Sequence, residues 1–273
     1  DYGASMKTVR GQTVIVAKLE GFGAVGEDGR HCQCRMEYTL EADAGGYIPE
    51  FVVNSLVPKN LRLVEEVRLE FNRDDQIDLE EVSRLVCIME NPVDETYNRD
   101  ELASITSVEG LAAVAQTTLT PLESPSPYVE MKKSVVEGQK NNTGYGAVTI
   151  DASIEELAAK EYMNYSRSEL KMFYGKNGGV MKNLVKYGNH SFVNRSVYDL
   201  KIPGFSHREF IWKLMWKRLS SDEFIVVYAP LVDLEPEWNF AVAKDTVRAS
   251  SWTLVRYLRL PEVGRLPQTR MTY

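Results

Sequence analysis

The chain has 273 residues, of which 44% are hydrophobic and 26% charged, a balance typical of one large folded domain or two small ones. Its net charge of -7 at pH 7 argues against nucleic acid as a partner, because phosphate binding requires a basic face. Three cysteines do not make a disulfide framework in a chain of this length and indicate a reducing, cytoplasmic compartment. No apolar run approaches the ~20 residues that a membrane-spanning helix requires.

The end of the sequence repeats its beginning. Residues 9–38 and 247–273 carry the same Val-Arg and Val-Gly pairs at equal separation, and an insertion at 27–29 brings the rest into register. The identities in the closing runs are Arg30, Gln33, Arg35, Met36 and Tyr38, matched by Arg265, Gln268, Arg270, Met271 and Tyr273. Self-similarity at a fixed offset is typical of tandem arrays. It predicts the tail of one module, a connector, and the head of the next.

The first predicted elements are a strand from Val14 to Leu19 and a second strand over 32–43, joined by a glycine-rich turn into a hairpin. The turn run GFGAVG satisfies the G-x-G-x-x-G template of dinucleotide-binding sites. A strand follows this run, however, and not the helix whose N-terminus holds a pyrophosphate. We therefore expect no nucleotide and no other cofactor.

Two clusters of metal-ligand residue types occur in the first third of the chain. Strand alternation sends His31 to the face opposite Cys32 and Cys34, so these three residues do not converge on a zinc ion. The acidic residues from Asp74 to Glu81 lack the central glycine of a calcium loop and are predicted to form a solvated turn that caps the next helix. We expect no metal site.

Helices are predicted after the hairpin. Pro49 is well placed for a first helical turn, and apolar residues at helical spacing follow it. Pro58 is expected to kink or restart this helix because it lacks the N–H group that the hydrogen-bond ladder requires. A further short helix is predicted from Leu79 to Met89, at the end of a segment that spans residues 1–90.

Residues 91–145 are rich in Ser, Thr and Pro and predict a connector with one short helix near 100–116. Ordered structure is expected again over 146–273. There Ser153 and Glu156 form an S-x-x-E capping box that opens an amphipathic helix running toward Met172. Further on, a strand with period-two alternation places four large apolar residues on one face: Phe210, Trp212, Leu214 and Trp216.

Two motifs resemble the START (StAR-related lipid transfer) family, whose fold is the helix-grip. The run from Ile202-Pro203 to Arg208-Glu209-Phe210 resembles the family's "lP, then RDF" pattern, with Glu in place of Asp. The run EADAGGYIPEFVVN resembles the family's entry into its long C-terminal helix, through Asp43, Gly45, Gly46, Ile48, Pro49 and Asn54. The closing half of the module comes first in this chain, which departs from the family's order.

The resemblance implies an α+β fold in which a curved antiparallel sheet wraps a long C-terminal helix. With the repeat, it implies a piece of a tandem START-like protein: a closing half at 1–90, a connector at 91–145, and an opening half at 146–273. The two halves are also compatible with closure into one permuted domain, and the oligomeric state stays open.

A helix-grip cavity implies binding, transfer or sensing of a lipid or another hydrophobic molecule, with transient membrane contact. Burial of a long acyl chain is worth roughly 10 kcal/mol before ordering costs, and no nucleophile is needed. The candidate lining residues are Phe210, Trp212, Leu214 and Trp216 from the sheet, and Ile48, Val52 and Leu56 from the helix. We expect no catalytic residues. The alternatives are a protein-interaction scaffold and a cyclase-like or aromatase-like enzyme on the same fold.

Overall fold

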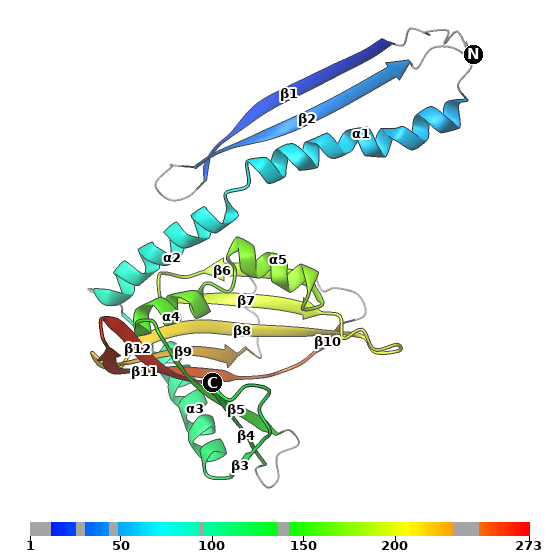
Figure 1. Cartoon of the computed structure of the whole chain (residues 1–273). Helices are drawn as coiled ribbons and strands as arrows, with labels where there is room; N and C mark the ends of the chain where they lie inside the picture. Colours follow the sequence, from blue (N-terminus) through cyan, green and yellow to red (C-terminus); the bar gives the residue numbers. More distant parts are fainter. Residues whose placement is uncertain (1–11, 26–30, 44–48, 93–95, 136–141, 232–245) are drawn as a thin grey trace, which may run out of the picture. The chain divides into compact units, whose positions relative to one another are not determined.

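The computed structural model describes residues 12–25, 31–43, 49–92, 96–135, 142–231 and 246–273 (Figure 1). The chain divides into two compact units, Asp1–Arg73 and Asp74–Tyr273. This boundary lies closer to the N-terminus than the expected end of the first segment at residue 90, because the helix that follows Arg73 packs within the second unit.

The first unit contains the predicted hairpin and one long helix. β1 (Gln12–Val25) pairs antiparallel with β2 (His31–Asp43). α1 (Glu50–Glu70) begins after Pro49, as predicted, and continues through Pro58. The expected restart at Pro58 is therefore wrong, because the helix tolerates the loss of one backbone donor there.

The described part of the second unit contains four helices: α2 (Asp74–Glu90), α3 (Arg99–Gln116), α4 (Ile154–Tyr162) and α5 (Arg167–Gly175). The capping box of Ser153 and Glu156 is present at the start of α4. The helix expected to run on toward Met172 is instead divided, because Ser166 caps a new helix by accepting a hydrogen bond from the Glu169 N–H. No helix among the described residues is long and apolar enough to cross a membrane.

The sheet of the second unit has ten strands, and its order is β3-β4-β5-β12-β11-β9-β8-β7-β6, with β10 parallel to β8 (Figure 1). Its strands are β3 (Leu119–Pro121), β4 (Val129–Ser134), β5 (Thr143–Ile150), β6 (Gly179–Lys186), β7 (Ser191–Tyr198), β8 (His207–Arg218), β9 (Glu223–Pro230), β10 (Thr246–Arg248), β11 (Thr253–Val263) and β12 (Leu266–Thr272). All pairings along this order are antiparallel, as an α+β fold of this class requires.

Two expectations about the arrangement need correction. The C-terminal region consists of strands β11 and β12 and not of a long helix, since the long helix α1 precedes the sheet in the chain. The expected connector at 91–145 holds the helix predicted near 100–116, which is α3, and also β3, β4 and the first residues of β5. Between β3 and β4, the Ser124 hydroxyl donates to the Ser126 carbonyl at 2.8 Å, a local hydrogen bond typical of a turn.

Helices cover both faces of this sheet. On the face that we call the α4 face, α2 and α4 pack over a core that includes Phe192, Leu214, Trp216 and Tyr257. On the opposite face, the α3 face, Ile105 and Val108 of α3 pack over alternate strand residues such as Met215. Period-two alternation thus divides each central strand between two cores.

The acidic residues expected in a solvated turn differ in burial, because Asp75 at the start of α2 is exposed whereas Asp78, one turn later, is buried. The carboxylate of Asp78 accepts hydrogen bonds of 2.9 Å from the backbone N–H groups of Arg167 and Ser168 at the start of α5. Burial opposes ionisation, but these bonds and the Arg167 charge together lower the pKa of Asp78. Asp78 therefore fixes α2 against α5.

Candidate functional site

The four large apolar residues predicted on one face of β8 differ in burial. Leu214 and Trp216 are fully buried beneath α2 and α4, where they are part of the packed core. Phe210 and Trp212 lie further along the same face and are only half-buried. Their rings stack with centroids 5.1 Å apart and planes inclined by 8°.

The stacked pair lines a pocket of about 610 Å³. The other lining residues are Lys176, Asn177, Gly178, Tyr198, Asp199, Leu200, Lys201 and Ser251. The Trp212 ring is held in place by its Nε1, which donates to the Ser251 carbonyl at 3.0 Å. Gly178 has a φ of 70° and an added Cβ there would lie 2.6 Å from the Asp199 carbonyl, so a glycine is required where the chain enters β6. One wall of the pocket is therefore a fixed aromatic stack, and the rest of the lining includes charged residues such as Lys176, Asp199 and Lys201.

Trp212 connects this pocket to a polar cluster on the α4 face. Its ring lies edge-on to that of Tyr228, with centroids 6.3 Å apart. The Tyr228 hydroxyl donates a 2.5 Å hydrogen bond to the Glu161 carboxylate of α4. The Tyr257 hydroxyl and Oδ1 of Asn164 are buried on the same face and have no hydrogen-bond partner among the described residues. Buried polar atoms are rarely left unpaired, which makes this cluster a candidate for contact with a ligand or an ordered water.

The environment of the cluster favours uncharged forms of its groups. Burial raises the pKa of Glu161, although the hydrogen bond from Tyr228 acts in the opposite direction. Burial and the nearby Glu161 charge also raise the pKa of Tyr228 and of Tyr257. Burial lowers the pKa of Lys182 to about 8, and its Nζ donates to the Asn164 carbonyl at 2.5 Å. The arrangement offers phenol and carboxyl groups that donate or accept hydrogen bonds.

The remaining predicted residues lie elsewhere. Val52 is on α1 in the first unit with 36% of its surface exposed, and Leu56 is on the same helix. Ile48 lies outside the described residues, as do Gly45 and Gly46. Of the family-like motif residues, Asp43 ends β2 and Pro49 is the N-cap of α1. Arg208 is on β8 and donates to the Ser206 carbonyl at 2.7 Å.

The residues predicted from the sequence do not include Glu161, Asn164, Tyr228 or Tyr257. One signal was available for Glu161, since it lies three residues after the buried Ala158 on the apolar face of α4. Tyr228 is two residues beyond Val226 in β9, so strand alternation places it on the α4 face. The contact between the two residues depends on the fold, because they are 67 positions apart.

Comparison with protein-family models finds no match for this chain, and no curated protein matches its sequence. Solved structures do match. A STAR-related lipid transfer protein from Xanthomonas axonopodis is 13% identical, with a TM-score of 0.40 over 57% of this chain and 80% of the other. Human STARD10 is 13% identical, with a TM-score of 0.43 over 68% of this chain and 70% of the other. Human StAR-related lipid transfer protein 5 is 10% identical, with a TM-score of 0.42 over 63% of this chain and 81% of the other.

The structural neighbours of this chain thus include StAR-related lipid transfer proteins, at low sequence identity. The likeness is one of fold alone. The division of the chain into the tail and head of tandem modules stays a prediction.

Proposed function

We propose that this protein binds a hydrophobic molecule with an uncharged polar end, without catalysing a reaction on it. The observation that carries this proposal is the half-buried Phe210–Trp212 stack, which lines a pocket and contacts Tyr228 of a buried polar cluster. An apolar wall with a few convergent polar groups is the usual composition of a small-molecule site.

The aromatic wall supplies the affinity. Burial of apolar surface is worth about 25 cal/mol per Å², so a ligand that covers the faces of Phe210 and Trp212 gains several kcal/mol before ordering costs. Both rings are already fixed, Trp212 by Ser251 and Phe210 by the stack. Little side-chain entropy is therefore lost when a ligand binds, which supports a lipid or a similar apolar body as the occupant.

The polar cluster determines which lipid head groups are preferred. Glu161 has a raised pKa, and a phosphate placed beside it would meet an acid and two phenols. Lys182, which contacts the cluster, is held by the Asn164 carbonyl, and the lysines of the pocket lining are Lys176 and Lys201. A ligand with a hydroxyl or amide group would hydrogen-bond to the unpaired Tyr257 hydroxyl and Asn164 Oδ1 without the burial of a charge. We therefore expect neutral head groups, such as those of sterols, ceramides or diacylglycerols, to bind better than phospholipids or fatty acids.

The proposal is tested by native mass spectrometry of the full chain after incubation with vesicles that contain all five lipid classes. A retained adduct with the mass of a neutral lipid is the expected result. Trp212→Ala should weaken binding about tenfold or more, since ~1.4 kcal/mol of lost contact is tenfold in Kd. Tyr128→Ala is the matched control, because Tyr128 is 83% exposed and lies outside the pocket lining.

Glu161→Gln separates selection from affinity. The amide keeps the shape of the carboxyl, so the variant should retain hydrophobic binding and change the order of preference among head groups. Transfer of a fluorescent neutral lipid between vesicles then distinguishes a carrier from a static binder. Failure of the wild type to take up any lipid class, with the variants equally empty, would favour the scaffold interpretation instead.

A further inference from the structure

Basic residues are concentrated in one segment of this acidic chain. From Lys171 to Arg208 the chain carries seven lysines and arginines and one acidic residue, Asp199, although its net charge is -7. Two of the seven, Lys182 and Arg195, bind groups within the fold. The other basic residues still outnumber Asp199, so this part of the second unit is positively charged.

Two exposed lysines of this segment lie at the pocket of the aromatic stack. Lys176 is the C-cap of α5, Lys201 is in the loop between β7 and β8, and both line the pocket. The two chain segments are joined by backbone, because the Asp199 N–H donates to the Gly178 carbonyl at 2.8 Å. Within the described part of the chain, neither ammonium group forms an ion pair. Their charges are therefore open to a partner.

The β7–β8 loop presents two large apolar side chains beside these lysines. In the run Ile202-Pro203-Gly204-Phe205, the Phe205 N–H donates to the Ile202 carbonyl at 3.1 Å, and Gly204 has a φ of 81°. Proline at the second position and a positive φ at the third are typical of a type II turn. Such a turn brings its first and fourth residues together. Ile202 and Phe205 are 50% and 57% exposed.

The residues before the turn extend this surface to the pocket. Leu200 lines the pocket and is 41% exposed. Lys201 has a φ of 54°, a left-handed conformation, and its N–H donates to Oδ1 of Asp199 at 2.8 Å. The backbone of the loop is thus fixed at its base while its side chains face solvent. We call the exposed residues of this surface the basic rim: Lys176, Leu200, Lys201, Ile202 and Phe205.

We propose that the basic rim docks on a lipid bilayer that contains anionic lipids. Membrane-surface binding grows with the apolar area that enters the interface and with the attraction between cations and anionic head groups. Ile202 and Phe205 supply the apolar area, and the lysines supply the charge. A lysine suits this position because its stem lies along apolar surface while its ammonium stays in the polar layer.

A nucleic acid is the less suitable partner for this surface. Phosphates would pair with the lysines, but they offer nothing to the three apolar side chains between them. The inference goes beyond the proposed function, which concerns the molecule inside the pocket. It does not depend on that function, since docking is measured whether or not a lipid is taken up.

Flotation of the full chain with lipid vesicles tests the proposal. Vesicles of phosphatidylcholine are compared with vesicles that also contain about 30% phosphatidylserine, which have a negative surface potential. Binding to the anionic vesicles should be about tenfold stronger or more, and should weaken between ~0.05 M and ~0.5 M salt because ions screen the lysines. Equal binding to both kinds of vesicle, binding to neither, or a preference for single-stranded RNA over the anionic vesicles overturns the proposal.

Charge reversal locates the contact on the protein. Lys176→Glu and Lys201→Glu should each weaken binding to the anionic vesicles several-fold and leave any binding to phosphatidylcholine unchanged. Lys133→Glu is the matched control, since Lys133 is exposed on β4 and is not part of the basic rim. An equal loss for Lys133→Glu would show that only the net charge of the chain matters, which overturns the assignment to this surface.

The apolar contribution is tested separately. Phe205→Ala should weaken binding at both salt concentrations, because burial of apolar surface is not screened by ions. Tyr128→Ala, which removes an exposed aromatic side chain from the β3–β4 loop, should leave binding unchanged. Losses that are equal for the two variants contradict the proposed docking surface.

A fluorescent label gives a readout that does not require Phe205→Ala to fold. All three native cysteines are replaced by serine, and an environment-sensitive fluorophore is attached at Ser206→Cys or at Tyr128→Cys, both exposed positions. Anionic vesicles should shift the emission to the blue for the label at position 206 and not for the label at position 128. A shift at neither position, or the same shift at both, overturns the proposal.

Discussion

The hairpins β1–β2 and β11–β12 share a sequence pattern and a pairing register but differ in what surrounds them. Leu19 and Tyr257 occupy matched positions, each opposite a matched methionine. Leu19 has 68% of its surface exposed, whereas Tyr257 has 1%. The second hairpin lies within a ten-stranded sheet between two helical layers, while the first forms a two-stranded sheet.

This difference shows that the repeat defines strand pairing but not burial. Alternation and turn residues set which residues of a hairpin face each other. Neighbouring strands and helices then decide which of those residues become core. Tyr257 and Arg259 of the second hairpin contact α4, and the matched residues of the first hairpin are Leu19 and Gly21. Substitutions at matched positions of the two hairpins test whether the surroundings decide burial.

The largest expected effect separates Tyr257 from Leu19. Tyr257→Ala should destabilise the second unit by about 3 to 5 kcal/mol, because it leaves a cavity beneath α4. Leu19→Ala should change stability by less than about 0.5 kcal/mol, since an exposed side chain loses few contacts. Urea unfolding followed by circular dichroism measures both. Equal losses for the two variants would contradict the proposed role of the surroundings.

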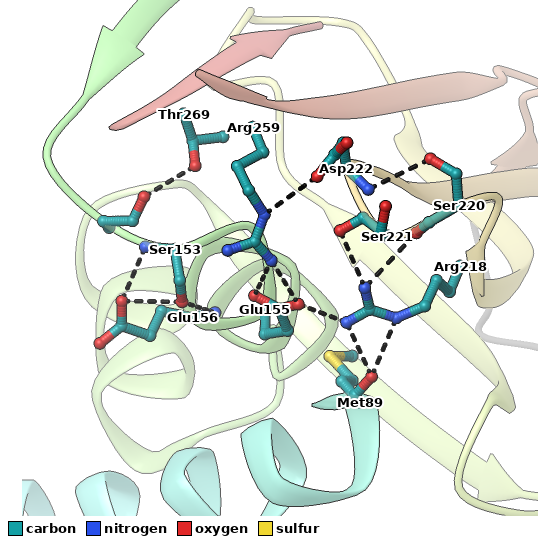
Figure 2. A network of polar contacts seen from close by, with 11 residues as sticks. Met89, Ser153, Glu155, Glu156, Arg218, Ser220, Ser221, Asp222, Arg259 and Thr269 are labelled. Carbon is teal, nitrogen blue, oxygen red and sulfur yellow. Dashed lines mark hydrogen bonds and ion pairs between the residues drawn. The ribbon is translucent and has the colours of Figure 1, made fainter. Parts of the chain in front are cut away.

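The next largest effect concerns Glu155 of α4, which binds Arg259 of the second hairpin and Arg218 of β8 (Figure 2). Glu155 is 4% exposed and accepts hydrogen bonds from Arg218 and from Arg259, the latter at 3.0 Å. Arg218 also donates to the Met89 carbonyl at the end of α2, at 3.1 Å. Arg259 matches Gly21 in the repeat, so the first hairpin has no equivalent of this network.

Glu155→Ala should therefore cost about 3 kcal/mol, because it leaves a buried guanidinium without its counter-ion. Arg259→Met should cost less than about 1 kcal/mol, since its side chain is 41% exposed and the ion pair is solvated. A double-mutant cycle of Glu155 with Arg218 should give a larger coupling energy than one with Arg259. A larger coupling energy with Arg259 would mean that Arg259, and not Arg218, is the main partner of Glu155.

Much of this local structure follows from the sequence, and some signals were present but missed. The first hairpin was predicted from its strand-favouring residues and glycine-rich turn, and α4 from its capping box. The same S-x-x-E spacing at Ser166 marks the start of α5. The short helix expected near 100–116 is confirmed as α3, and its Asn98 cap with Glu101 was a further signal for its start. The division between α4 and α5 is a short-range feature that a more complete use of helix caps predicts.

The candidate site was only half predictable. Strand alternation placed Phe210 and Trp212 on one face of β8 with Leu214 and Trp216, but it does not say where α4 ends and the open pocket begins. Glu161 and Tyr228 meet only because α4 crosses β9, and no local pattern encodes that crossing. Tertiary packing therefore decides both which residues of this face are buried and which residues form the polar cluster.

The third prediction concerns pH, because Tyr257 and Tyr273 of the second hairpin lie near Glu161. The folded state holds the Glu161 proton more tightly than the unfolded chain does. Stability from this group is full below its usual pKa of 4.5 and falls as pH rises from there through the raised folded value. The slope for one proton is at most about 1.4 kcal/mol per pH unit.

Glu161→Gln removes this titration. Relative to the wild type, the variant should become progressively more stable as the pH rises above about 4.5, and the two should converge in their pH dependence below it. Thermal unfolding between pH 4 and pH 8 measures the difference. Curves that stay parallel across this range would show that Glu161 is ionised in the folded protein.

The smallest expected effect lies in the turns. The second hairpin turns through Gly264 and Arg265, and Gly264 has a φ of 66°. Gly264→Ala should cost about 1 kcal/mol because an L side chain disfavours that conformation. Gly110→Ala in α3 is the matched change of opposite sign, since no atom lies within 4 Å of the added Cβ and alanine favours a helix by up to about 1 kcal/mol. Urea unfolding of the two variants measures both changes, and a Gly264→Ala variant as stable as the wild type would contradict the cost assigned to this turn.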